Sequence, residues 1–432
     1  MKLDLAGVGI GPFNLSIAAL LYENSSLKSH FFDGGDKFEW HPGLLLPDAF
    51  MQTCYLKDLV TAVAPSSSYS FLAYLVEKKR FYRFLASGLS MISRNEFSDY
   101  MSWASKRLEN LSFSRQIQAI EFHDQTFHLH TKNESIQAKN ICLGTGKRPY
   151  IPDNFKPALG ESVFHASGLL HKECNLDGKR VTIIGGGQTG ADIVLNALNG
   201  VWGKPEKLTW ISRRPNFQPL EESAFIDEYF TPDYVNCFYD LPELTKRREI
   251  NTQKFTSDGI THRCLTDIYQ IMYQRFDVKA EKRWITLQPN RTAHGIRATK
   301  SGFNIHCCNA LDKNEEVHQA DLVILATGFE SALADCLTPI LPLLNLDNNS
   351  SLILGRHFDV QWKHQKTNKI FAVNAGLSSH GIAEPQLSLM AWRSAIIINH
   401  LSNKKLFDVS DSQGFIEWLS EEDKPLQAPL SA

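Results

Sequence analysis

The sequence of 432 residues has no Cys-X-X-Cys pair, although it contains eight cysteines. This absence excludes the dithiol redox centre of a flavoenzyme of the thioredoxin-reductase kind. The histidines show neither His-Glu-X-X-His nor zinc-finger spacing, so we expect no metal site. The vicinal pair Cys307-Cys308 is expected to lie in a strand and not to act as a redox couple.

Long apolar runs and an excess of charge of one sign are also missing. No apolar stretch reaches the roughly 20 residues that span a bilayer, and Asp4 interrupts the apolar N-terminal segment, unlike a signal peptide. Lys+Arg and Asp+Glu nearly balance at 45 and 47, which gives a net charge of −2. This balance provides no field that attracts nucleic acid or an anionic membrane. We therefore expect a cytoplasmic protein that binds neither.

Two glycine-rich fingerprints of the dinucleotide-binding kind are present. The first is Gly7-Val8-Gly9-Ile10-Gly11-Pro12, and the second is Gly185-Gly186-Gly187-Gln188-Thr189-Gly190. Each follows a short β-type run and precedes an Ala/Leu/Ile-rich helical pattern, as a strand–turn–helix unit requires. The glycines let a pyrophosphate approach the backbone at the positive end of the helix. A chain with two such units is expected to bind two dinucleotides and to pass electrons between them.

The end of the strand that follows each fingerprint indicates which dinucleotide binds there. After the first fingerprint this strand ends in Asp33, whose carboxylate suits the ribose hydroxyls of FAD or NAD. After the second it ends in Ser212-Arg213-Arg214, and guanidinium groups suit a phosphate. We therefore assign FAD to the first unit and NADPH to the second.

These assignments predict an α/β fold with two Rossmann-like dinucleotide-binding domains, for FAD and NADPH, and a small substrate-binding region. We expect the first part of the FAD domain at 1–168, the NADPH domain at 169–315, and the FAD-domain return with the substrate-binding region at 316–432. The apolar run Asp321–Phe329, which enters a tight turn, is expected to return the chain to the FAD sheet.

Several uncommon strings lie at or beyond the fingerprints. They are Gly7 through Asn14-Leu15, Trp40-His41-Pro42-Gly43, Met51-Gln52-Thr53, Leu56-Lys57-Asp58-Leu59, Asp227-Glu228-Tyr229-Phe230-Thr231-Pro232, Ala326-Thr327-Gly328, His380-Gly381-Ile382-Ala383-Glu384-Pro385 and Leu387-Ser388-Leu389. Together they resemble the flavin-dependent N-hydroxylating monooxygenases, which act on lysine, ornithine and small diamines in siderophore biosynthesis. The resemblance covers nearly the whole chain.

The resemblance implies a specific chemistry. NADPH reduces FAD, the reduced flavin activates O2, and the terminal primary amine of a small aliphatic substrate receives one oxygen atom. Only a neutral amine has the lone pair for this attack, whereas a free alkylamine has a pKa of about 10.4. A dry pocket over the flavin would lower that pKa and exclude water. Because the cofactors carry the chemistry, the protein is expected to position its ligands and to supply no nucleophile.

The resemblance also implies roles for individual residues. Gln52 resembles a glutamine beside flavin and nicotinamide, Lys57 a lysine that pairs with the substrate carboxylate, and Asp227 lies in a segment that frames nicotinamide and substrate. His380-Gly381 precedes a helix expected to begin near Pro385, whose amides would face the flavin pyrimidine ring. The expected cofactor-binding residues are Gly7, Gly9, Gly11, Pro12, Asn14, Asp33, Trp40, His41, Gln52, Gly185, Gly187, Gln188, Thr189, Ser212, Arg213, Arg214, Thr327, Gly328, His380 and Gly381.

The substrate stays open between two kinds of amine. Ornithine-specific relatives have an Asn-Tyr pair where this chain reads Thr256-Ser257-Asp258-Gly259, which argues against ornithine. L-lysine remains, with Lys57 on its carboxylate, as does a diamine such as putrescine or cadaverine with its second ammonium near Asp258 or Glu384. Lys57, Thr256, Asp258 and Glu384 are therefore the expected substrate-binding residues.

Other classes of function remain as alternatives. An NADPH-flavin reductase or oxidase would react with oxygen and hydroxylate nothing, and a Baeyer–Villiger or sulfur-oxidising monooxygenase would take a ketone or a thioether. A nucleotide-sensing binding protein would not turn over. The family resemblance further suggests a homodimer or homotetramer.

Overall fold

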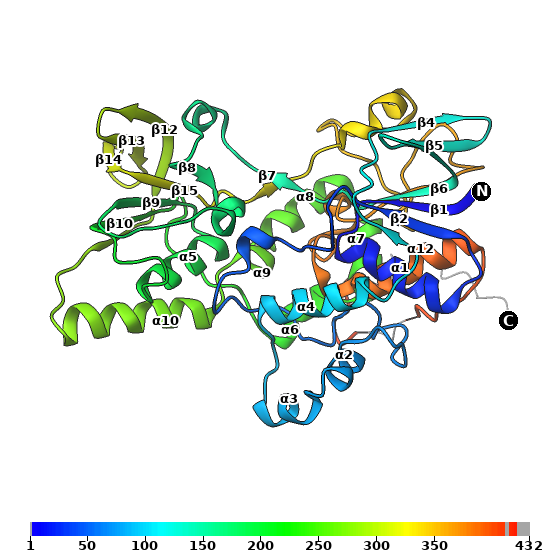
Figure 1. Ribbon diagram of the computed structural model, residues 1–432, viewed down its shortest axis with the longest axis horizontal. Coiled ribbons are helices and arrows are strands. Elements are labelled where there is room, and N and C mark those ends of the chain that lie inside the picture. The colour runs from blue at the N-terminus through cyan, green and yellow to red at the C-terminus, as the bar shows by residue number, and fades with distance from the viewer. Residues whose placement is uncertain (1, 411–413, 421–432) are drawn as a thin grey trace.

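Two mainly parallel sheets, one in each lobe of the molecule, organise the structure (Figure 1). The computed structural model describes residues 2–410 and 414–420. The first sheet has the order β3-β2-β1-β6-β5-β4, and β17 also pairs with β6. Its strands are β1 (Lys2–Val8), β2 (Ser29–Phe32), β3 (Leu111–Ser112), β4 (Ala119–His123), β5 (Thr126–His130), β6 (Ser135–Leu143) and β17 (Ile370–Ala372).

The second sheet has the order β11-β10-β9-β15-β8 and is parallel throughout. Its strands are β8 (Val163–His165), β9 (Arg180–Ile184), β10 (Lys207–Ile211), β11 (Ile285–Gln288) and β15 (Leu322–Leu325). A separate antiparallel sheet contains β12 (Arg291–Thr299), β13 (Gly302–Asn309) and β14 (Glu315–Ala320). Cys307 and Cys308 lie in β13, as predicted, and both are free thiols.

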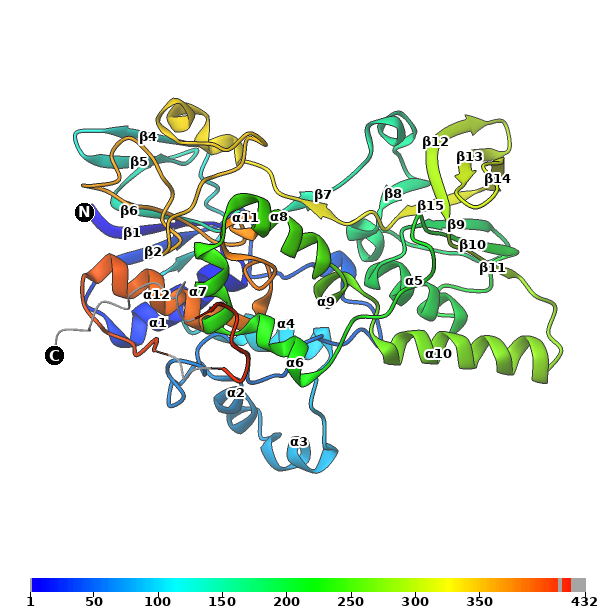
Figure 2. The same cartoon turned by 180° about the vertical axis from the view of Figure 1, so that it is seen from behind.

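The predicted fold class is confirmed, because each fingerprint joins a strand to a helix in its own sheet. Helix α1 (Pro12–Asn24) follows β1, and α5 (Gln188–Leu198) follows β9. Near the C-terminus, α12 (Met390–Ser402) packs against α1 in the core of the first lobe (Figures 1 and 2). The first lobe is therefore built from both ends of the chain.

One predicted strand lies in the other sheet. The apolar run Asp321–Phe329 was expected to rejoin the FAD sheet, but β15 pairs with β8 and β9 in the second sheet. The strand that returns to the first sheet is β17. A strand that is buried on both faces is a continuous apolar run whichever sheet it belongs to, so its sequence does not show which sheet it joins. As a result, β8 and β15 belong to the second sheet although they fall outside the expected range 169–315.

The remaining helices surround the two sheets. In the first lobe, Ser70 caps α2 and Ser93 caps α4 with their side chains. None of the helices in the described residues is long and apolar enough to cross a membrane. The other α-helices are α2 (Phe71–Glu77), α3 (Phe81–Ser87), α4 (Arg94–Ser105), α6 (Ala224–Asp227), α7 (Pro232–Asp240), α8 (Glu243–Thr252), α9 (Phe255–Asp258), α10 (His262–Met272) and α11 (Leu377–His380).

A short antiparallel ribbon runs between the lobes (Figures 1 and 2). It pairs β7 (Arg148–Pro149) with β16 (Phe329–Glu330), and the amide of Tyr150 donates to the carbonyl oxygen of Gly328 at 2.9 Å. The ribbon places the turns that end β6 and β15 beside each other, at the junction of the two dinucleotide-binding units.

Candidate active site

Both fingerprints open into one cavity of about 930 Å³. The first lobe contributes Gly9 and Gly11 to its wall, and the second lobe contributes Gly185, Gly186 and Gly187. This volume lies at the upper end of the roughly 300–1,000 Å³ that is usual for ligand pockets. One cavity shared by two lobes can hold two dinucleotides against each other.

The first fingerprint forms a turn that only glycine can make. Gly9 has a φ of +86°, and a Cβ there would lie 2.5 Å from the carbonyl oxygen of Gly144. The amide of Ile10 donates to Asp33 Oδ2 at 2.7 Å. Helix α1 begins at Pro12, and its N-cap residue Gly11 provides no side-chain cap, so the amides that follow Pro12 are free to bind an anion at the cavity. This arrangement fits a pyrophosphate with its ribose beside Asp33.

The second fingerprint repeats this geometry. Gly185 has a φ of +135°, and a Cβ there would lie 2.0 Å from the carbonyl oxygen of Ala326. A Cβ on Gly190 would lie 2.2 Å from the carbonyl oxygen of Gly185, which shows how closely the helix approaches the strand. Helix α5 begins at Gln188, and its N-cap residue Gly187 again provides no side-chain cap. The second unit therefore also fits a pyrophosphate.

The three residues expected to select a phosphorylated coenzyme line the same part of the cavity. Ser212 is buried and accepts from the amide of Arg214 at 3.1 Å, while Arg213 is exposed. Arg214 Nη1 donates to the carbonyl oxygen of Gly186 at 3.0 Å, which ties this guanidinium to the fingerprint. Its Nη2 pairs with Asp258 Oδ2 at 3.0 Å. Asp258, which was expected near the substrate, thus lies beside the expected phosphate group.

Two glutamines connect the lobes across the cavity. Gln52 Nε2 lies 3.5 Å from Gln188 Oε1, which also accepts from the amide of Thr261 at 2.8 Å. Gln188 Nε2 in turn donates to Asp192 Oδ1 at 2.7 Å. Burial raises the pKa of Asp192 to about 6, and the hydrogen bond from Gln188 and the charge of Arg94 oppose this rise. The network fixes Gln52 where it can contact ligands from both lobes.

An aromatic and basic wall lies next to Gln52. Trp40, His41 and Arg94 all line the cavity, and the Arg94 guanidinium lies 5.2 Å from the Trp40 ring centroid. Burial, assisted by the charge of Arg94, lowers the pKa of His41 to about 4, so its imidazole is neutral at pH 7. Arg94 was not predicted, because it lies in a helix without a recognisable motif.

Comparison with known proteins identifies the family. The sequence profile of L-lysine 6-monooxygenase/L-ornithine 5-monooxygenase matches residues 1–331. The chain belongs to this family. It is a flavin-dependent N-hydroxylating monooxygenase, as its motifs predict, and this excludes the alternatives of a plain flavin reductase and a nucleotide-sensing protein.

Individual relatives of this monooxygenase cover almost its whole length. It is 47% identical to the L-lysine N6-monooxygenase of Escherichia coli over 97% of this chain and 99% of that protein. It is 30% identical to the putrescine N-hydroxylase of Acinetobacter baumannii over 96% and 93%. It also superimposes on the FAD-bound cadaverine monooxygenase DfoA of Erwinia amylovora with a TM-score of 0.91, at 26% identity over 98% and 99%. An ornithine N-hydroxylase of Kutzneria, solved with reduced FAD, NADP+ and L-ornithine, has a TM-score of 0.85 at 24% identity over 93% and 99%.

Two predicted cofactor residues of the monooxygenase hold the backbone around its cavity. Asn14 is buried, and its Nδ2 donates to the carbonyl oxygen of Gly9 at 2.8 Å, beside the Gly144 turn. Thr327 donates its hydroxyl to the carbonyl oxygen of Tyr150. Both residues line the cavity, together with Gly328, but their side-chain hydrogen bonds shape the turns that a cofactor would contact.

Glu384 has a structural environment instead of the expected substrate-binding one. Its side chain is 2% exposed and accepts from the amides of Asn374 at 2.7 Å and Gly376 at 2.9 Å. Arg393 lies 3.5 Å from its Oε1 and is equally buried. Because its oxygens are satisfied inside the protein and it does not line the cavity, Glu384 is not in a position to hold a substrate ammonium.

His380 and Gly381 likewise do not line the cavity. The His380 ring stacks on Phe358 with centroids 4.1 Å apart, and burial lowers its pKa to about 3. The helix expected near Pro385 begins at Met390, because a 3-10 turn at Leu387–Leu389 precedes it. The residues of this segment that reach the cavity are Pro385, Gln386 and Leu387.

The other expected substrate and catalytic residues lie outside the cavity wall. Lys57 is half-buried, and its amide donates to the carbonyl oxygen of Cys54 in a turn close to Gln52. Asp227 is exposed at the end of α6, and Thr256 is buried and donates to the carbonyl oxygen of Gln253. Of the residues expected to contact substrate, Asp258 alone lines the cavity.

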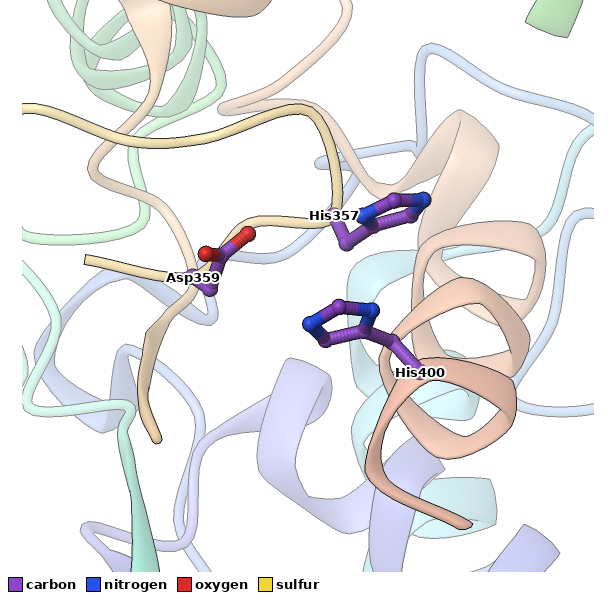
Figure 3. Close-up of side chains that lie close together, drawn as sticks. All are labelled: His357, Asp359 and His400. Carbon is purple, nitrogen blue, oxygen red and sulfur yellow. The ribbon is translucent and has the colours of Figure 1, made fainter. Parts of the chain in front are cut away.

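A cluster of His357, Asp359 and His400 lies apart from this cavity (Figure 3). Their potential ligand atoms are within 4.8 Å of one another, but the two imidazoles stack face to face, 4.4 Å apart and 11° from parallel. A metal ion binds an imidazole nitrogen in the plane of the ring, so two parallel rings cannot both hold one ion. Burial lowers the pKa of both histidines, which favours a neutral stacked pair. We assign no metal to this cluster.

Proposed function

We propose that this monooxygenase is an L-lysine N6-hydroxylase that supplies a hydroxamate siderophore pathway. The observation that carries the proposal is the 47% identity to a lysine N6-monooxygenase along essentially the full length of both chains, against 30% for a putrescine N-hydroxylase. The absence of the Asn-Tyr pair at Thr256-Ser257 supports lysine over ornithine.

The chain uses FAD and NADPH, and the two units of the cavity suit them in that order. FAD fits against the first fingerprint, with its pyrophosphate at the free amides of α1 and a ribose beside Asp33. NADPH fits against the second, with its pyrophosphate at α5 and its 2′-phosphate beside Ser212, Arg213 and Arg214. Among the solved relatives, one contains FAD and another contains reduced FAD together with NADP+.

Bound FAD, once reduced by NADPH, supplies activated oxygen, and the protein must present a neutral amine to it. Preparing that amine at pH 7 costs about 4.6 kcal/mol if its pKa stays near 10.4. An amine in the part of the cavity lined by His41, Gln52 and Arg94 would lie near a buried guanidinium and a neutral imidazole. The charge of the Arg94 guanidinium and burial of the amine both disfavour a second cation and lower the amine's pKa, while neutral His41 adds no opposing negative charge and Gln52 can orient the N–H groups.

The substrate assignment is tested by measuring hydroxylamine formed from lysine, ornithine, putrescine and cadaverine by the FAD-loaded enzyme. We expect kcat/KM to be about 100-fold or more higher for lysine than for cadaverine, because a site that pairs a substrate's polar group rejects the analogue that lacks it. A higher kcat/KM for cadaverine or putrescine would contradict the lysine assignment. NADPH consumption without hydroxylamine from any amine would contradict the whole proposal.

Lys57→Ala should raise KM for lysine by about 10- to 150-fold, which corresponds to the loss of one hydrogen-bonded charge pair of about 1.5–3 kcal/mol. Lys57 lies in the loop that follows Gln52 and is the residue proposed to pair with the substrate carboxylate. Cadaverine has no carboxylate, so its KM should not change, and FAD content should remain that of the wild type. Lys106→Ala is the matched control, because Lys106 is an exposed lysine at the C-terminus of α4, in a different segment from the turn that joins Lys57 to Gln52. An unchanged KM for lysine would remove Lys57 from the site.

We also propose that the protein works in the cytoplasm as a homo-oligomer. Large apolar side chains are exposed along and next to helices α2 and α3, which protrude from the first lobe (Figure 1). They are Val76, Tyr82, Leu85, Leu89 and Met91. Such a patch is typical of an association surface, and sedimentation equilibrium of the FAD-loaded enzyme measures the assembly.

A further inference from the structure

The wall beside the second fingerprint gathers positive charge around one carboxylate. Asp258 Oδ2 lies 3.0 Å from Arg214 Nη2 and 3.6 Å from Lys254 Nζ. Lys147, from the first lobe, lines the same cavity. Burial lowers the pKa of its ammonium group, and the negative charges of Glu384 and Asp258 act in the opposite direction. Asp258 is thus the carboxylate that pairs with both Arg214 and Lys254 in this wall.

The Arg214 guanidinium is held by other contacts, whereas the Asp258 carboxylate is largely exposed and can turn away. The Arg214 side chain is 16% exposed, donates to the Gly186 carbonyl oxygen and lies over the Phe255 ring at 5.4 Å. The Asp258 side chain is 54% exposed and ends the four-residue helix α9. Arg214 would therefore keep its place if Asp258 turned away, because its contacts with Gly186 and Phe255 do not involve the carboxylate.

We propose that Asp258 occupies the phosphate position of the coenzyme and is displaced when the 2′-phosphate binds. This inference rests on the proposed placement of NADPH. A phosphate monoester carries about −1.5 to −2 charges at pH 7 and has three acceptor oxygens, so it competes with a single carboxylate for the same guanidinium. Lys254, whose ammonium already lies at Asp258, becomes a second cation for the phosphate. The Asp258 carboxylate therefore weakens binding of the phosphorylated coenzyme and leaves the rest of the nucleotide site unaffected.

The test uses adenosine 2′,5′-bisphosphate, which carries the 2′-phosphate, and ADP, which does not. Their affinities are measured by isothermal titration calorimetry with the FAD-loaded enzyme and its variants. Asp258→Asn should bind the bisphosphate about 3- to 10-fold more tightly, since it removes a partly exposed competitor and its repulsion, while ADP affinity stays within about 2-fold. Lys254→Ala should weaken bisphosphate binding by a similar factor.

Asp267→Asn is the matched control, because Asp267, like Asp258, pairs with a basic residue at i,i+4 spacing but lies outside the cavity. It should change neither affinity. Unchanged or weaker bisphosphate binding by Asp258→Asn would overturn the inference. The placement of NADPH is tested separately. If the wild type binds the bisphosphate no more tightly than ADP, and Arg214→Ala changes the affinity for neither ligand, NADPH does not bind as proposed.

Discussion

We expect Arg393→Ala to lower the free energy of unfolding by about 3–5 kcal/mol, the usual cost of removing one partner of a buried ion pair. Arg393 is 2% exposed, and its guanidinium donates to the carbonyl oxygen of Glu384 and lies beside the Glu384 carboxylate. It also lies over the ring of Phe13, 4.6 Å from the centroid, in the first turn of the helix that follows the flavin fingerprint. The alanine variant would leave a buried carboxylate without its cation.

Urea unfolding of the FAD-free protein, followed by far-UV circular dichroism, measures this loss. Arg115→Ala provides a matched control in the same lobe, because Arg115 and Glu134 are paired at 2.7 Å on the surface. That variant should change the unfolding free energy by less than about 1 kcal/mol. The double variant Arg393→Met with Glu384→Gln removes both charges and should recover part of the loss, because the glutamine oxygen can accept from only one of the two backbone amides that Glu384 binds. Equal effects of Arg393→Ala and Arg115→Ala would contradict the importance of the buried pair.

Gly9→Ala should yield protein that retains little FAD. The substitution forces a residue with a side chain to a φ of +86° and places its Cβ 2.5 Å from the backbone oxygen of Gly144. The left-handed conformation and the overpacking together cost about 2–5 kcal/mol, and the turn that meets the pyrophosphate must shift to relieve them. The ratio of flavin to protein absorbance after purification, and after incubation with excess FAD, measures the effect.

Gly88→Ala separates the backbone cost from the steric cost. Gly88 ends α3 with a φ of +65°, and a Cβ there would have no atom within 4 Å. This variant should lose about 1–2 kcal/mol of stability and keep its full complement of FAD. If Gly9→Ala also retained normal FAD, the first fingerprint would not be the flavin site.

The fingerprints were predictable because their requirements are local. A glycine at positive φ, a strand before it and a helix after it all appear within a dozen residues, as at Gly9 and Gly185. The sheet that a strand joins is a tertiary property, and so the run at Leu322–Leu325 was placed in the wrong sheet. Topology depended on pairing with β8 and β9, which the local pattern does not encode.

The site itself was predicted only in part, for two physical reasons. Strings shared with a family can mark packing as well as chemistry, and Glu384 and His380 are examples, since both are buried away from the cavity. Conversely, Arg94, Lys147 and Lys254 line the cavity from segments with no periodic or motif signal. Only the folded chain brings their charges to the wall of one cavity.

The order in which the two lobes can be completed during protein synthesis follows from the return of the chain to its first sheet. The strands of the second sheet span residues 163–325, so they have all been synthesised before β17 and α12. The first sheet needs β17, and α1 needs α12, whose last residue is Ser402. The N-terminal lobe is thus the last to be finished, against the usual order of folding on the ribosome. Stable acquisition of flavin must accordingly wait until the chain as far as Ser402 has left the ribosome.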